Sequence, residues 1–128
     1  MNDIARERFE TMSWHDALLL HLHVDRRAPG TRDVVTLHIQ WVDGQTSFVS
    51  FGDCYKLEAN MNFGIIAAES IRSAHCILDS PRVAEERRKW AQLGVSLDDL
   101  MSFEFEMNST GSVVRVLARS FEIEQSTA

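Results

Sequence analysis

The sequence predicts an α+β fold, with a single antiparallel β-sheet of about six or seven strands and two helices packed on one face of the sheet. Residues 18–25 and 34–41 each alternate between apolar and polar side chains, and Pro29-Gly30 lies between them. This is the pattern of a β-hairpin with one buried face. Strands do not alternate with helices along the chain, which argues against a parallel sheet. The 128 residues fit one domain, spanning 1–128.

The first elements follow from local spacing. Residues 3–12 predict a short helix, and Asp3 is placed to cap its start. The two strands of the hairpin come next, and their period-2 alternation divides each into two faces. The side chains expected in the core are Leu18, Leu20, Leu22 and Val24 from the first strand, and Val35, Leu37, Ile39 and Trp41 from the second.

The middle of the chain continues the sheet. Asp43-Gly44 predicts a turn between strands, residues 46–51 a third strand, and Gly52-Asp53 a bend or bulge after it. A fourth strand then carries the inward side chains Tyr55, Leu57, Ala59, Met61 and Phe63. Residues 65–78 fit either a helix or a strand, and their weak helix formers favour a strand from about 70 to 78.

The last third contains a helix and two strands. Ser80 is an N-cap, Pro81 occupies the first helical position and Gly94 marks the end, so a helix over 80–94 is expected. Residues 103–107 then alternate as a strand. The final strand, 113–123, changes phase near Arg119, which predicts a bulge at that residue or the next.

Composition limits the function classes. The chain carries 19 acidic and 13 basic residues, for a formal net charge of −6, and has no basic stripe. It is therefore a poor candidate for binding nucleic acid or an anionic membrane, and a basic protein partner suits it better. No apolar stretch approaches the roughly 18 residues of a membrane helix. The first residues lack a signal-peptide core, so a cytoplasmic location is expected.

Three histidines lie on the polar face of the first hairpin: His21, His23 and His38. If the turn is centred near Pro29-Gly30, His21 lies opposite His38, whereas a slip of two residues places His23 there. Either register brings the three imidazoles within cross-strand reach, which is the convergence that a zinc or nickel site needs. The alternative, that they are polar residues on the wet face of a sheet, is the one that the sequence favours.

Three other groups resemble catalytic arrangements but have simpler structural explanations. His15 and Asp16 are adjacent, and neighbours on a strand point to opposite faces. Cys54 and Cys76 lack metal-type spacing and lie among apolar residues, which indicates buried thiols. Glu104 and Glu106 are expected opposite Arg115 and Arg119 in the last hairpin, which predicts a row of surface ion pairs rather than a paired-carboxylate site. No catalytic residue and no cofactor are therefore predicted.

Several short segments together carry a resemblance: Ser13–Ala17 (SWHDA), Phe51–Cys54 (FGDC), Ala59–Gly64 (ANMNFG), Lys89-Trp90 and Asn108–Ser112 (NSTGS). They resemble small uncharacterised bacterial proteins of α+β type, some of them similar to immunity proteins that neutralise secreted toxins. The resemblance implies an α+β fold and toxin neutralisation through a protein partner. It supplies no catalytic residue.

We therefore expect a non-enzymatic protein-binding module. Its contact surface is expected on the edge strands or on the polar face of the sheet. A homodimer is a further alternative, because an uncovered edge strand can pair with the same strand of a second copy. The alternative is a metal-binding protein or a metal-dependent hydrolase that uses the cluster of His21, His23 and His38.

Overall fold

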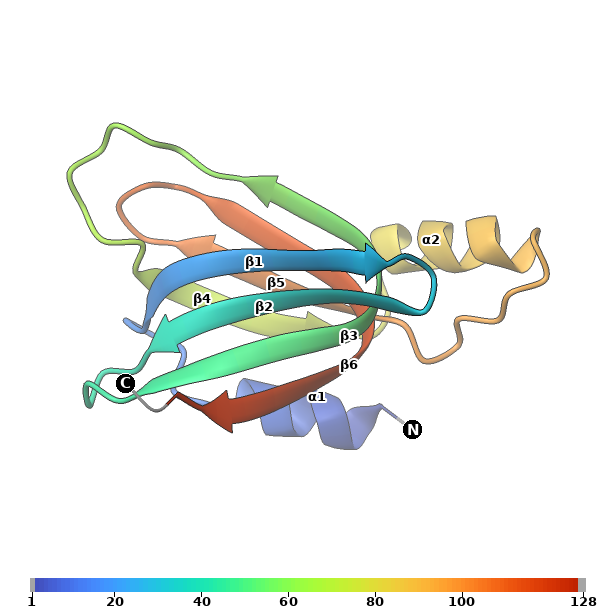
Figure 1. The fold of residues 1–128 in the computed structure, drawn as a ribbon, viewed down its shortest axis with the longest axis horizontal. Helices are drawn as coiled ribbons and strands as arrows, with labels where there is room; N and C mark the ends of the chain where they lie inside the picture. The colour runs from blue at the N-terminus through green and yellow to red at the C-terminus, as the bar shows by residue number, and fades with distance from the viewer. Residues whose placement is uncertain (1, 127–128) are drawn as a thin grey trace.

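The computed structural model describes residues 2–126, which form six strands and two helices (Figure 1). In chain order these are α1 (Asp3–Glu10), β1 (Leu18–Ala28), β2 (Arg32–Gln40), β3 (Thr46–Asn60), β4 (Ile71–Ile77), α2 (Pro81–Ala91), β5 (Met101–Met107) and β6 (Val113–Gln125). All the strands belong to one antiparallel sheet, in the order β1-β2-β3-β6-β5-β4. The predicted α+β class and the single antiparallel sheet are confirmed.

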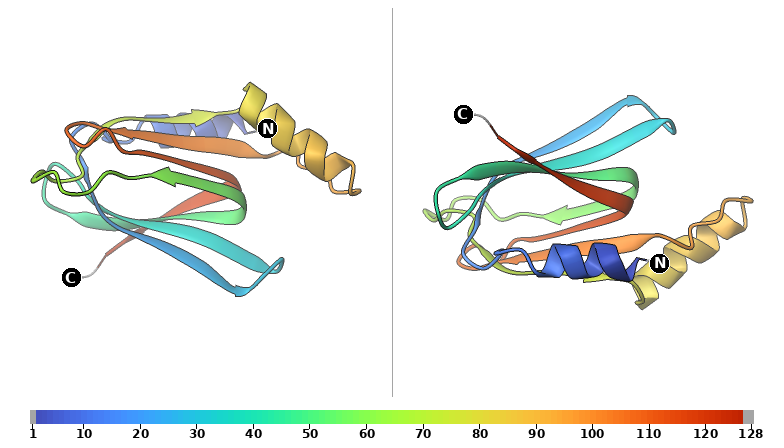
Figure 2. Two further views of the ribbon diagram at one scale, coloured as in Figure 1. Left: turned by 90° about the horizontal axis from the view of Figure 1, so that it is seen from above. Right: turned by 90° about the horizontal axis from the view of Figure 1, so that it is seen from below.

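The sheet curls until its two edge strands meet at one end. Leu18 of β1 forms an isolated antiparallel bridge with Ser70, which directly precedes β4. Next to it, the backbone N–H of Ile71 donates to the carbonyl of Ala17 over 2.8 Å. The two halves of the sheet diverge from this junction toward the β1–β2 turn and α2 (Figure 2). The sheet therefore has a closed end, where its edges touch, and an open end, where they do not.

The main core fills the concave side of the curled sheet. Phe9 of α1 packs into it, with its ring centroid 5.1 Å from that of Phe103 and 5.4 Å from that of Phe121. Trp14 covers the closed end and donates its indole N–H to the carbonyl of Phe9 over 2.7 Å. Burial of each large apolar side chain contributes about 1.5–3 kcal/mol. This cluster is therefore the main source of stability.

A second, smaller core lies beneath α2. Val83 of the helix packs with Leu97, Leu100 and Leu117, all of them buried. Leu117 follows Val116 on β6, so the two side chains point to opposite faces of the sheet, and Val116 belongs to the main core. The two helices therefore lie against opposite faces and not together on one face, because the outer face has an apolar residue of its own for α2 to cover.

The face assignment at the start of β1 is wrong. The pairing with β2 shifts register between Leu19 and His21, so Leu20 is an extra residue in a bulge. Leu19 therefore enters the core and is 7% exposed, whereas Leu20 is 40% exposed. Beyond the bulge Leu22 is partly buried against the core, but Val24, which was also predicted to be inward, is 47% exposed because it lies where the sheet opens. Leu37 on β2 is buried as expected, at 1% exposure.

The predicted third and fourth strands are one long strand, β3. The expected bend at its middle is present. Asp53 has a φ of 51°, in the left-handed region, and the pairing with β6 shifts between Cys54 and Lys56. The strand ends at Asn60, so Phe63 does not point inward as predicted; it is 86% exposed.

The bulge predicted near Arg119 is not found, because β6 pairs with β3 without a register shift at that point and the extra residue lies in β3. The remaining expectations concern element ends. The strand interpretation of the ambiguous region is confirmed by β4. Ser80 caps α2 by accepting a hydrogen bond from the backbone N–H of Val83 over 3.2 Å. Asp3 does not cap α1, because Asn2 occupies the N-cap position. Between residues 2 and 126, neither helix has the length and apolar character needed to cross a membrane.

Candidate functional site

The three histidines of the first hairpin lie on the outer face of the sheet. His21 is directly opposite His38 and His23 is opposite Thr36, which is the register expected for a turn near Pro29-Gly30. The His21 and His38 rings are stacked, with centroids 5.7 Å apart and planes 13° apart. His38 also stacks on Phe48 of β3, with centroids 4.5 Å apart. Three rings thus form a column across β1, β2 and β3.

This stacking bears on the predicted metal site. An imidazole nitrogen binds a metal through a lone pair in the plane of its ring, and the lone pairs of parallel rings do not converge. Among the described residues, no group of three or more His, Cys, Asp or Glu side chains is arranged to hold a metal ion. Metal binding by His21, His23 and His38 stays a prediction, and it requires at least one ring to leave the stack.

The segment between β3 and β4 presents apolar side chains to solvent. Phe63 and Ile66 are almost entirely exposed, and Ile65 is about half exposed. We call residues 63–66 the apolar loop. The loop lies at the closed end of the sheet, where it projects beyond the strands (Figure 1). Exposed apolar side chains that adjoin one another mark interaction sites more often than isolated ones do.

Polar contacts hold both ends of this segment against the β5–β6 turn. On the incoming side, the amide side chain of Asn62 donates to the carbonyl of Thr110 over 2.9 Å. Its backbone N–H donates to the hydroxyl of Ser112 over 3.0 Å. On the outgoing side, the Thr110 hydroxyl donates to Glu69, and the backbone N–H of Asn108 donates to the carbonyl of Ser70 over 2.8 Å. The loop is therefore fixed in place while its apolar side chains remain free.

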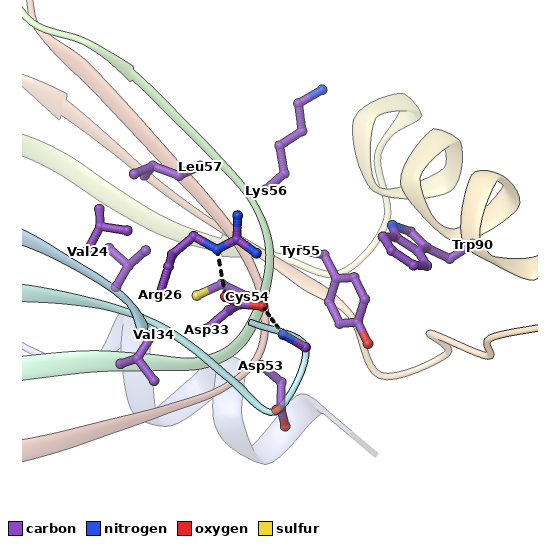
Figure 3. A pocket seen from close by; sticks show the side chains of 12 residues that line it. Val24, Arg26, Asp33, Val34, Asp53, Cys54, Tyr55, Lys56, Leu57 and Trp90 are labelled. Carbon is purple, nitrogen blue, oxygen red and sulfur yellow. Dashed lines mark hydrogen bonds and ion pairs between the residues drawn. The ribbon is translucent and has the colours of Figure 1, made fainter. Parts of the chain in front are cut away.

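The open end of the sheet contains a cavity of about 480 Å³ (Figure 3). Its apolar lining comes from both sides of the opening, with Val24 and Val35 from the first hairpin and Leu57 from β3. Cys54 also lines it and donates its thiol to the carbonyl of Phe51 over 3.0 Å. The cavity exists because the strands diverge here, whereas they are joined at the other end.

One cation is oriented in this cavity by a fixed carboxylate. Nε of Arg26 donates to Oδ1 of Asp33 over 2.7 Å, and Oδ2 of Asp33 accepts from the backbone N–H of Gly30 over 3.1 Å. These two hydrogen bonds, the one from Arg26 first, lower the pKa of Asp33 from its usual value. The carboxylate is therefore ionised at neutral pH and holds the guanidinium at the opening.

An aromatic pair forms the wall of the cavity nearest α2. The rings of Tyr55 and Trp90 meet edge to face, with centroids 5.0 Å apart. The indole N–H of Trp90 donates to Glu86 over 3.0 Å, and Glu86 is itself buried. The bulge in β3 turns Tyr55 toward the helix, which is why this pair forms.

The thiols are unsuited to nucleophilic catalysis. Burial raises the pKa of Cys54 to about 11 and that of Cys76 to about 12. A thiolate is the reactive form, so both groups are protonated and inert at neutral pH. This agrees with the interpretation of both residues as structural thiols.

The other two arrangements are surface pairs. His15 and Asp16 do approach each other, with Nδ1 and Oδ2 3.2 Å apart, because Asp16 adopts a positive φ of 68°. Both side chains are exposed. Glu104 lies opposite Arg115 with a separation of 3.7 Å, as expected, whereas Arg119 pairs with Asp99 and not within the hairpin.

The apolar loop and the cavity were not predicted from the sequence. Phe63 continues the alternation of β3 in the sequence, and nothing in that pattern shows that the strand stops at Asn60. The cavity joins residues from β1, β3 and α2, which only the fold brings together. Comparison with models of known protein families found no match, and neither did comparison with curated proteins.

Proposed function

We propose that this protein is a non-enzymatic protein-binding module of the immunity type, and that the apolar loop is its main contact surface. The observation that carries the proposal is the exposure of Phe63 and Ile66 on a loop held by hydrogen bonds at both ends. A fixed loop loses little conformational entropy on binding, so its apolar contacts contribute more to affinity. The segments that carry the resemblance include the first two residues of this loop, Phe63 and Gly64, and the turn that anchors it.

The distribution of charge supports a basic partner. Among the described Arg and Lys residues, only Arg8, Lys56 and Arg88 have no ion pair. The carboxylates without an ion pair in residues 2–126 are Glu7, Asp43, Asp53, Glu69, Glu85, Asp98, Glu122 and Glu124. The net negative charge is therefore presented as free carboxylates, which accelerate association with a cationic protein.

The test compares three immobilised proteins in a native lysate at low and high salt. These are the wild type, the double variant Phe63→Ser/Ile66→Ser, and Leu93→Ser, which removes another exposed apolar side chain just after the end of α2. We expect a protein that the wild type and Leu93→Ser retain and that the loop variant loses. High salt should reduce its recovery, because screening weakens long-range attraction.

The immunity-type part has its own test. The retained protein should inhibit growth when it is produced alone, and co-expression of the wild type should suppress that inhibition, whereas the loop variant should not. If no retained protein depends on the loop, the proposed contact surface is wrong. If the retained protein is harmless, the module binds a protein but is not of the immunity type.

A further inference from the structure

The cavity at the open end is a separate feature from the apolar loop. The loop projects from the closed end, and the cavity lies by α2 at the other end (Figures 1 and 3). Strand divergence exposes an apolar lining there, with Val24 on one side and Leu57 on the other. Mouths of β-barrels and similar openings are common ligand sites when a few polar groups converge on an apolar surface.

Arg26 is the polar group that reaches into this opening. Its Nε is occupied by Asp33, but neither of its Nη nitrogens has a hydrogen-bond partner among residues 2–126. Figure 3 shows the guanidinium above Cys54, between the hairpin and β3, while Lys56 and Asp53 point away to opposite sides. The charge of Asp33 is already matched by Arg26 and the Gly30 N–H. The remaining guanidinium donors therefore face the cavity without a partner.

The geometry points to a binding site for a small organic acid. The carboxylate of the ligand accepts hydrogen bonds from the Nη groups of Arg26, and its apolar or aromatic body packs on Val24 and Leu57. Planar guanidinium groups bind carboxylates through two parallel hydrogen bonds, and a guanidinium already fixed through Nε loses little freedom in doing so. Asp33 is the positioning residue for Arg26. This site does not rest on the protein-binding proposal.

The test uses two matched pairs of probes, phenylacetate with phenylacetamide and hexanoate with hexanamide. Each is titrated into the full-length protein and followed by ¹H–¹⁵N NMR, which locates binding through shifts of individual backbone amides. For acids of this size we expect a Kd on the order of 1 mM or tighter. The shifts should be concentrated at residues 33–35 and 54–57. Each acid should bind about tenfold more tightly than its amide, because the charged hydrogen bonds are lost with the carboxylate.

Two arginine variants distinguish hydrogen bonding by Arg26 from a nonspecific effect of the protein's net charge. Arg26→Gln should remove the preference for the acids, and the exposed position of Arg26 makes a folding defect from this change unexpected. Arg27→Gln changes the net charge equally but removes a guanidinium that pairs with Asp25 and does not line the cavity, so it should bind like the wild type. The Phe63→Ser/Ile66→Ser variant should also bind normally. Absence of shifts at the cavity, or a preference for acids that survives Arg26→Gln, would overturn the inference.

Discussion

Arg87 of α2 and Leu100, which directly precedes β5, are joined by a hydrogen bond of 3.0 Å from guanidinium Nη2 to the backbone carbonyl. The same guanidinium donates to the carbonyls of Leu78, Leu97 and Asp98, at 3.1 to 3.3 Å. One side chain therefore ties the chain before α2 to the connector after it. This contact fixes the helix over the second core.

Replacement of Arg87 by Met should destabilise the fold by about 2–4 kcal/mol, because charged hydrogen bonds are lost and partly buried carbonyls are left without a donor. Urea denaturation followed by circular dichroism measures the change. Arg88→Met is the matched control, since Arg88 is exposed and has no such contact, and it should change stability by less than about 0.5 kcal/mol. Equal effects of the two changes would show that Arg87 does not hold the connector.

Truncation of Leu37 to Ala should cost about 2–5 kcal/mol, because its side chain is fully buried and its removal leaves a cavity in the main core. Leu20→Ala removes the same atoms from the bulge in β1, where the side chain is 40% exposed, and should cost much less. Both are measured by urea denaturation. A larger loss for Leu20 than for Leu37 would contradict the register of the first hairpin.

Because of the two thiols, the free energy of unfolding should decrease at alkaline pH. Their folded-state pKa values of about 11 and 12 lie above the reference of 9.0, so the folded state holds these protons more tightly than the unfolded state. Their contribution is complete below pH 9 and declines as the pH rises toward 11–12. Urea midpoints should therefore fall between pH 8.5 and 10.5, and the fall should be smaller in Cys54→Ala/Cys76→Ala. Identical slopes in the two proteins would rule out this source.

Zinc binding by the histidine column is tested by calorimetry on the wild type and His38→Ala. If the trio binds the metal, His38→Ala should weaken affinity, and acidification should weaken binding by the wild type, because only the neutral imidazole binds a metal. Binding should also disturb the stack of His38 on Phe48, which NMR detects at the Phe48 ring. The same weak isotherm for both proteins would mean that these are ordinary surface histidines.

Local signals in the sequence predicted the elements well. The Ser80–Pro81 start of α2 and the alternation on β2 and β5 depend on nearby residues, and they were confirmed. The sequence left two registers open for the first hairpin, and the structure has the one centred near Pro29-Gly30, with His21 opposite His38. The bulge at Leu20 was missed because a run of three leucines fits either face equally well.

The candidate sites were harder to predict because they depend on contacts between distant segments. The apolar loop is held in place because Asn62 and Glu69 are bound by the β5–β6 turn, 48 and 41 residues later in the chain. The Arg26 cavity requires the curl of the whole sheet and the bend at Asp53. The spacing of residue types within a single segment therefore predicts neither the apolar loop nor the cavity.

The bridge between Leu18 and Ser70 also limits edge-to-edge pairing between copies of this protein. A sheet with two free edges can grow by stacking copies edge to edge, with each added strand pairing along the full length of the last. Here the start of β1 is already paired with the residues just before β4. An incoming strand therefore could not form backbone hydrogen bonds with β1 or β4 at that end. Substitutions that break this bridge should therefore free the edges of the sheet for pairing with a second copy.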